Sequence, residues 1–200
     1  MKISVIIPAY LQSHKDAEML YGLLDLEYRM DKNKHEIIVV NDGSPVEPLA
    51  ASGITIMQKE NGGVASARNL GLDVARGDFV VFVDADDKVA DNFFELLDEA
   101  AKEDADICYF KVACEDGSVA YREPCAWGKL VKRSYIGDRR FDENQLIGEE
   151  DTLFLPLQKE KPPKKIYKDA ILYYYRWSAN PDSLMKRFWR GEIKKRKDEE

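Results

Sequence analysis

The chain has 200 residues, of which 44% are apolar and 34% are charged, and its formal net charge at pH 7 is -7. These values are typical of a folded domain and exclude a disordered chain, and the negative charge argues against nucleic-acid binding by counterion release. No apolar run approaches the roughly 18 residues of a transmembrane helix. Residues 1–8 are strand-like, so neither a membrane-spanning helix nor a signal peptide is expected.

Strand and helix signals alternate in the first half of the chain. Continuous apolar runs predict strands over residues 3–7, 36–40, 54–56, 79–83 and 106–112. Apolar residues at helical spacing predict helices over residues 14–28, 64–75 and 92–102, the first with Ser13 as its N-cap. This alternation favours a mostly parallel sheet covered by helices.

The second half is less regular. It predicts a hairpin over residues 115–123, short helices over 129–134 and 149–157, and an aromatic strand over 170–175. We expect one domain over residues 1–185, divided at residue 112, and a charged tail over 186–200. The tail reads as a solvated helix. The alternative is a contact with a membrane surface through Phe188, Trp189 and the basic side chains around them.

Cysteine and histidine exclude several kinds of chemistry. The three cysteines form no Cys-x-x-Cys pair, and we expect free thiols in the cytoplasm, with a disulfide between Cys114 and Cys125 as the alternative. The two histidines, His14 and His35, lack the spacing of a zinc site. Acid–base chemistry in this chain must therefore use carboxylates.

Polar residues follow the predicted strands where these end. Asp42 follows the second strand, and Asp84 and Asp86 follow the fourth. Parallel strands bring such residues to one rim of the sheet, where ligands bind in open α/β folds. Because the carboxylates repel each other there, a divalent cation carrying a diphosphate would stabilise the group. The structural alternatives are an ordinary Asp-Gly turn at Asp42 and a helix cap near Asp91.

Several stretches together resemble the inverting family 2 glycosyltransferases with the GT-A fold. They are residues 5–10, 37–44, 61–87, 127–130, 148–154 and 173–176, and the resemblance spans about residues 1–185. It implies an α/β fold of the GT-A type, a mostly parallel open sheet with helices on both faces. Residues 1–112 would form a Rossmann-like half that binds the nucleotide-sugar, and residues 113–185 a smaller acceptor half.

The resemblance also implies roles for residues on the donor side. The turn formed by Pro8, Ala9 and Tyr10 would line the nucleobase, and Asp42 would accept a hydrogen bond from uracil. Arg68 would help to hold the nucleotide. The family's DxD motif corresponds to Asp84-Ala85-Asp86 in this chain. Within it, Asp84 would face the ribose and Asp86 would bind Mn²⁺ or Mg²⁺.

On the acceptor side the resemblance implies one catalytic residue and several that border the substrate. Asp151 corresponds to the general base that deprotonates the attacking hydroxyl. Trp127, Lys129 and Glu150 would border the acceptor. Arg176 would reach the diphosphate or a phosphate on the acceptor. Without the resemblance, the acidic run that ends at Asp151 reads as a helix start favoured by the helix dipole.

These expectations describe a metal-dependent enzyme that transfers a sugar from a UDP-sugar, with inversion, to a glycan or a lipid-linked glycan. It would act in the cytoplasm or at the cytoplasmic face of the membrane. One alternative is a catalytically silent module that binds nucleotide-sugars. A nucleotidyltransferase is disfavoured, because residues 9–12 contain neither the glycine nor the basic residue that a triphosphate-binding loop needs.

Overall fold

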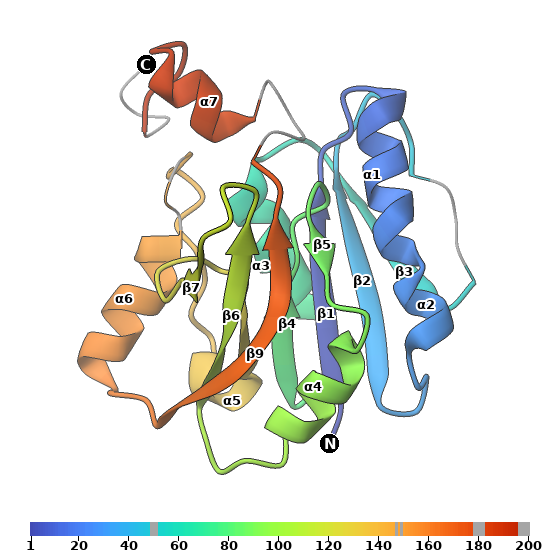
Figure 1. Ribbon diagram of the computed structural model, residues 1–200. Helices are drawn as coiled ribbons and strands as arrows, with labels where there is room; N and C mark the ends of the chain where they lie inside the picture. Colours follow the sequence, from blue (N-terminus) through green and yellow to red (C-terminus); the bar gives the residue numbers. More distant parts are fainter. Residues whose placement is uncertain (49–51, 147, 149, 178–182, 196–200) are drawn as a thin grey trace.

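The computed structural model describes residues 1–48, 52–146, 148, 150–177 and 183–195. One mixed sheet runs through it, with the strand order β3-β2-β1-β4-β8-β6-β9-β5 and β7 paired to β6 (Figure 1). The strands are β1 (Ile3–Ala9), β2 (His35–Asp42), β3 (Ile54–Lys59), β4 (Phe79–Phe82), β5 (Lys88–Val89), β6 (Ile107–Cys114), β7 (Val119–Tyr121), β8 (Lys129–Lys132) and β9 (Lys165–Tyr175).

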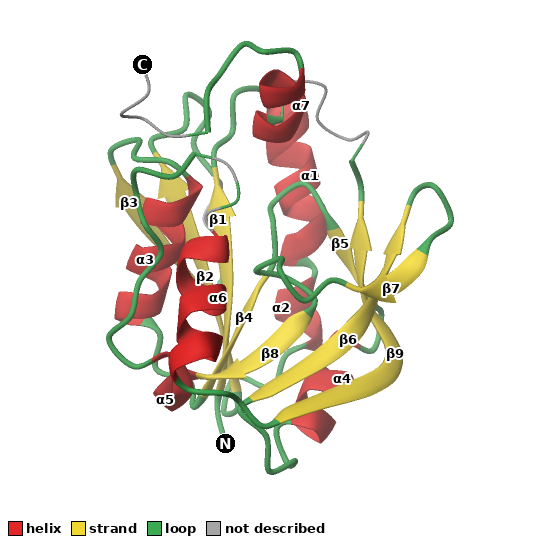
Figure 2. Ribbon diagram, turned by 90° about the vertical axis from the view of Figure 1, so that its left-hand side faces the viewer, coloured by secondary structure: helices red, strands yellow, loops and turns green. Residues whose placement is uncertain are grey.

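Helices cover both faces of the sheet, as Figure 2 shows. Alternate residues of β1 enter two separate cores, Val5 and Ile7 on one face and Ile6 on the other. One core also contains side chains of α1 (His14–Leu24), α2 (Leu26–Arg29) and α4 (Phe93–Ala100). The other contains side chains of α3 (Val64–Val74), α5 (Arg133–Ile136) and α6 (Glu150–Glu160). The predicted α/β fold with helices on both faces is therefore confirmed.

The first four strands in the sheet order, β3, β2, β1 and β4, are parallel. The apolar runs of β1, β2 and β4 suit strands that are buried on both faces, whereas the edge strand β3 has no fully buried residue. The predicted N-cap is also confirmed, because the Ser13 side chain accepts a hydrogen bond from the Asp16 amide and the Asp16 carboxylate bonds back to the Ser13 amide. The predicted first helix is divided at Asp25 into α1 and α2.

Three further elements differ from the prediction, two of them in the second half and one, β5, in the first half. The short helix expected at residues 129–134 is wrong, because Leu130 and Val131 are buried in β8, which pairs with β4 and β6, and α5 begins only at Arg133. Strand β9 begins at Lys165, well before the predicted start. The two-residue strand β5 was not predicted. It exists because Lys88 and Val89 pair with the end of β9.

Candidate functional site

A cleft of about 1150 Å³ lies at the carboxyl ends of the parallel strands. One wall comes from the loops after β1, β2 and β4, and the other from the β6–β7 turn, residues 122–127, the end of β9 and α7 (Leu184–Trp189). Helix α7 lies beyond the ends of β6 and β9 in Figure 1. Segments far apart in the sequence therefore meet around one cavity.

Asp42 ends β2 and organises the loop that faces it. The carboxylate is buried and accepts hydrogen bonds from the amides of Gly62 and Gly63, at 2.9 and 2.8 Å. Lys59 Nζ lies 2.6 Å from Asp42 Oδ1. Gly63 has a φ of 94°, which a side chain would strain, so the Gly62-Gly63 pair lets the backbone fold onto the carboxylate. Asp42 lines the cleft, as do Pro8, Ala9 and the half-exposed ring of Tyr10.

Arg68 projects from α3 and is almost completely buried. Its Nη2 lies 2.8 Å from Asp84 Oδ1, and its guanidinium lies near the rings of Phe82 and Phe141. A buried cation of this kind depends on its carboxylate partner, because an uncompensated buried charge is costly. The structure thus brings Arg68 and Asp84 together on the wall of the cleft, where both lie on its surface.

Asp86 lies in the same turn and also lines the cleft, together with Ala85. Burial and, after it, the negative charge of Asp84 raise the pKa of the Asp86 carboxyl to about 6. This repulsion shows that the turn concentrates negative charge. Among the described residues, no group of three or more histidine, cysteine or acidic side chains is placed to hold a metal ion by itself.

Asp87 ends the same turn but does not line the cleft, and no role is predicted for it from the sequence. It is buried, accepts a hydrogen bond from the Tyr173 hydroxyl at 2.6 Å, and accepts another from the Arg176 amide at 2.7 Å. Burial first, and then the charges of Asp84 and Asp86, raise the pKa of Asp87 to about 8. Its partners lie nearly ninety residues away in sequence. Only the acidic run after β4 could have drawn attention to it.

Two residues assigned to the acceptor side lie in different surroundings. Trp127 lines the cleft, and its indole stacks on Tyr173 and Tyr175, with ring centroids 5.0 and 5.3 Å apart. Lys129 is 0% exposed and lies outside the cleft lining. Its ammonium donates to the Glu123 carbonyl at 2.6 Å and lies 4.2 Å from the Phe154 ring centroid. Lys129 therefore does not border the cleft but supports its wall from within.

Glu150 and Asp151 begin helix α6, and their side chains lie outside the described part of the structure. The helix is anchored by the buried residues Leu153, Phe154 and Leu157. Gly148, shortly before the helix, lines the cleft. The last described residue before α6 therefore lies at the cavity.

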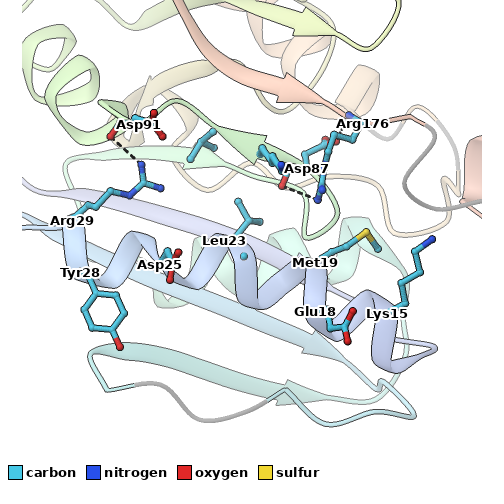
Figure 3. A pocket seen from close by; sticks show the side chains of 13 residues that line it. Lys15, Glu18, Met19, Leu23, Asp25, Tyr28, Arg29, Asp87, Asp91 and Arg176 are labelled. Atoms are coloured by element: carbon cyan, nitrogen blue, oxygen red, sulfur yellow. Dashed lines mark hydrogen bonds between the residues drawn. The ribbon is translucent and has the colours of Figure 1, made fainter.

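Arg176 does not line the main cleft. It lies in a second cleft of about 1050 Å³ between α1 and the segment that contains β5 (Figure 3). Its Nη2 donates to the Asp87 carbonyl at 3.4 Å. Lys15 and Met19 of α1 lie across this second cleft. The turn from Asp84 to Asp87 therefore lies between the two cavities, and the reach of Arg176 toward a diphosphate or an acceptor phosphate stays a prediction.

The outer wall of the main cleft carries aromatic rings and charges of both signs, which were not predicted from the sequence. Glu115 and Asp116 of the β6–β7 turn line it. Trp177 and Trp189 are 49% and 63% exposed, with ring centroids 6.2 Å apart. Arg122 and Arg187 lie on the same wall. Part of the segment predicted as a solvated tail thus forms a helix, α7, whose Arg187 and Trp189 line the cleft.

Carboxylates, a buried arginine and a glycine-rich loop at the ends of parallel strands define an α/β protein with a binding site at its switch point. The chain belongs to glycosyl transferase family 2, which it matches over residues 4–154. No helix in the described part of the structure has both the length and the apolar character needed to cross a membrane.

Curated relatives and solved structures agree with this assignment. The chain is 32% identical to the glycosyltransferase GlyG of Streptococcus pneumoniae, over 72% of this chain and 54% of the relative. It is 28% identical to the minor teichoic acid biosynthesis protein GgaB of Bacillus subtilis, over 91% of this chain and 24% of the relative. A crystal structure of Staphylococcus aureus TarS 1-349 in complex with UDP has the same fold, with a TM-score of 0.71, 21% identity, and coverage of 88% of this chain and 60% of that one. The chain thus spans only part of the length of each.

Proposed function

We propose that the chain transfers a sugar from a UDP-sugar to a hydroxyl of a glycan or a lipid-linked glycan, with inversion at the transferred carbon. The observation that carries this proposal is the joint position of Asp42, Arg68, Asp84 and Asp86 on one cleft at the ends of the parallel strands. Crystal structures of TarS, which shares the fold, are described in complex with UDP and with UDP-GlcNAc. These complexes support a uridine nucleotide as the donor.

In this proposal the residues of the donor wall bind the nucleotide. Tyr10 offers an exposed ring beside Pro8 and Ala9, on which a base can stack. The Asp42 carboxylate is fixed by two amides and Lys59, so it offers a preorganised acceptor to uracil. Arg68 would contribute positive charge near the diphosphate, and its present partner, Asp84, would then turn toward the ribose.

The carboxylates of the turn suit a magnesium or manganese ion. Both ions prefer oxygen ligands, and Mg²⁺ commonly takes one or two carboxylates and completes its shell with substrate phosphates and water. Asp86, with Asp84 beside it, fits that limited protein share, because the described residues provide no larger cluster of ligands. When bound, such an ion would neutralise charge on the departing diphosphate.

Asp151 would act as the general base. An inverting transfer needs one base to remove the proton of the attacking hydroxyl on the side opposite the leaving group. Gly148, the last described residue before α6, lines the cleft, which supports this assignment. Glu150 and Trp127 would border the acceptor, and Arg122 and Arg187 would place positive charge beside it, next to the acidic β6–β7 turn.

A lipid-linked acceptor would place the reaction at the cytoplasmic face of a membrane. Phe188 and Trp189 of α7, with the basic residues around them, would form the contact. The teichoic acid role named for GgaB supports an anionic cell-surface glycan as the acceptor class.

Calorimetric titration of UDP with and without Mn²⁺, beside GDP and ATP, tests the donor site. We expect binding that is selective for UDP and stronger with Mn²⁺. The Asp86→Ala variant should bind UDP no more tightly with Mn²⁺ than without it. Asp104→Ala is the matched control, because it removes an exposed carboxylate far from the cleft. Equal binding of all three nucleotides, or unchanged metal dependence in Asp86→Ala, would contradict the proposal.

A module that binds nucleotide-sugars without turning them over is the second candidate. It is favoured by one observation: Asp42, Arg68, Asp84 and Asp86 line the cleft together, and binding alone needs no catalytic base beside them. Release of UDP from UDP-sugars separates the two candidates. Metal-dependent UDP binding without any release of UDP would favour the silent module.

A further inference from the structure

One tyrosine hydroxyl contacts both ends of the carboxylate turn. The Asp84 amide donates to the Tyr173 hydroxyl oxygen at 3.1 Å, and that hydroxyl donates to Asp87 Oδ2 at 2.6 Å. The turn itself is closed by the Asp87 amide, which donates to the Asp84 carbonyl at 3.2 Å. Tyr173 thus bridges the first and last residues of the turn that presents Asp86 to the cleft.

Tyr173 is itself held from two directions. It is completely buried, and its ring lies 5.0 Å from that of Trp127 with only 7° between the planes. On the strand, Tyr173 pairs in register with Val89 of β5, two residues after Asp87. The Arg176 amide adds a further bond from the end of β9 to Asp87. The hydroxyl therefore has one position relative to the sheet.

The turn needs such a constraint because its charges repel one another. Asp84, Asp86 and Asp87 lie within four residues, and Asp87 is buried beside the other two. Without an external contact, the turn would relax to separate these carboxylates. A donor site, by contrast, requires them in one fixed arrangement, and small displacements of positioning groups are costly.

We propose that Tyr173 is a positioning residue for the donor site. Its hydroxyl fixes the Asp84–Asp87 turn. Its ring stacks on Trp127, on the acceptor side, so a displacement of Trp127 would also displace the carboxylates. This inference rests on the proposed function of the cleft as a UDP-sugar site. It goes beyond that proposal by assigning control of the donor carboxylates to a strand of the second half.

Tyr173→Phe tests the inference, because it removes the hydroxyl and keeps the stacked ring. Tyr135→Phe is the matched control. Tyr135 is also buried, and its hydroxyl donates to the Lys161 carbonyl at 2.8 Å, outside the cleft lining. Both variants lose one buried hydroxyl, so we expect similar decreases in thermal stability.

The variants should differ in two other measurements. In Tyr173→Phe we expect UDP affinity in the presence of Mn²⁺ to fall about tenfold, as for the loss of one or two hydrogen bonds, while metal-free UDP binding changes little. We also expect faster hydrogen exchange of the amides in residues 84–87. Tyr135→Phe should show neither change. A general loss of structure would lower both kinds of UDP binding.

The outcomes separate the inference from the proposed function. If the unmodified chain binds UDP with Mn²⁺ and Tyr173→Phe binds it equally well, the positioning role is wrong. If the unmodified chain does not bind UDP, the proposed donor site is wrong. In that case the exchange rates still decide whether Tyr173 holds the turn, and unchanged exchange in residues 84–87 would overturn it.

Discussion

The two walls of the cleft are built in different ways. On the donor wall, Asp42 ends β2 and Asp84 lies just after β4. The Asp42 carboxylate is fixed by hydrogen bonds from the amides of residues 62 and 63, and the Asp84 carboxylate by one from Arg68. On the outer wall, Arg122, Trp177 and Trp189 come from three separate segments, and the two indoles are largely exposed. The donor wall carries buried charges that are held by hydrogen bonds, whereas the outer wall presents exposed aromatic rings and charged side chains. Under the proposed function, this contrast corresponds to a fixed nucleotide site that faces an adaptable acceptor surface.

The largest effect is expected for Asp151→Asn. Loss of a general base lowers turnover by about 10² to 10⁴, while the donor wall should still bind UDP. Single-turnover release of UDP from a UDP-sugar measures the first quantity, and calorimetry measures the second. Glu160→Gln, at the other end of α6, is the control, because Glu160 pairs with Arg139 at the surface. Full activity in Asp151→Asn would place the base elsewhere.

A second large effect is expected on stability, at the packing of α3 against β1. A Cβ at Gly71 would lie 2.3 Å from Ile6 Cγ2, in the core beneath the donor wall. Gly71→Ala should therefore destabilise the chain by about 1–3 kcal/mol through overpacking. Urea unfolding measures this change.

Gly22→Ala is the matched control for Gly71→Ala. Gly22 also lies within a helix, α1, but a Cβ there meets nothing within 4 Å. Because alanine favours helix by roughly 0.5–1 kcal/mol over glycine, this variant should be stabilised. Equal effects at the two positions would show that α3 does not pack on β1 as described.

The same contrast explains what the sequence could and could not predict. The placement of Asp42, Asp84 and Asp86 on one cleft follows from strands that are apolar throughout and from the rule that parallel strands end at one edge. Lys129 was misplaced because its surroundings are tertiary: the Glu123 carbonyl and the Phe154 ring enclose it. Strand β8 was predicted as a helix because four residues carry too little periodicity to distinguish the two.

Part of the site could not be predicted because its residues contact partners that are far away in the sequence. The run after β4 shows four acidic or small residues, but nothing local indicates that Asp87 turns away from the cleft toward Tyr173. Helix α7 precedes a strongly charged sequence, residues 190–200, and its contact with the cavity distinguishes it from a solvated tail. Predictions from local pattern therefore describe the donor wall well and the outer wall poorly.

A smaller effect is expected on the pH dependence of stability. The pKa of Asp87 is raised to about 8 in the folded chain, above its ordinary value of 3.8. Between these values the folded chain binds more protons than the unfolded chain, so the free energy of unfolding should fall as pH rises. One such group contributes at most about 1.4 kcal/mol per pH unit.

Asp87→Asn removes this titration and should flatten the slope. Urea unfolding of metal-free protein at several pH values between 5.5 and 7.5 measures it. Asp86, whose pKa is raised to about 6, should leave part of the slope at the acidic end. Asp116→Asn is the control, because that carboxyl is exposed and its pKa is lowered, chiefly by hydrogen bonds to Ser118. Identical slopes in Asp87→Asn and the unmodified chain would contradict this explanation.

The smallest effect on the fold is expected for Trp189→Ala, which tests the independence of the two walls. The indole is 63% exposed, so stability should change by no more than about 0.5 kcal/mol, and UDP affinity should stay the same. Sedimentation with vesicles that contain an anionic lipid should instead show several-fold weaker binding, because an interfacial tryptophan beside basic residues supports such contacts. Tyr28→Ala is the control, since that ring is 87% exposed but lies on α2.

Weaker UDP binding in Trp189→Ala would show that the outer wall shapes the donor site. Vesicle binding that does not depend on lipid charge would instead show that α7 is a solvated helix. Its tryptophan would then contribute to the cleft and not to a membrane contact.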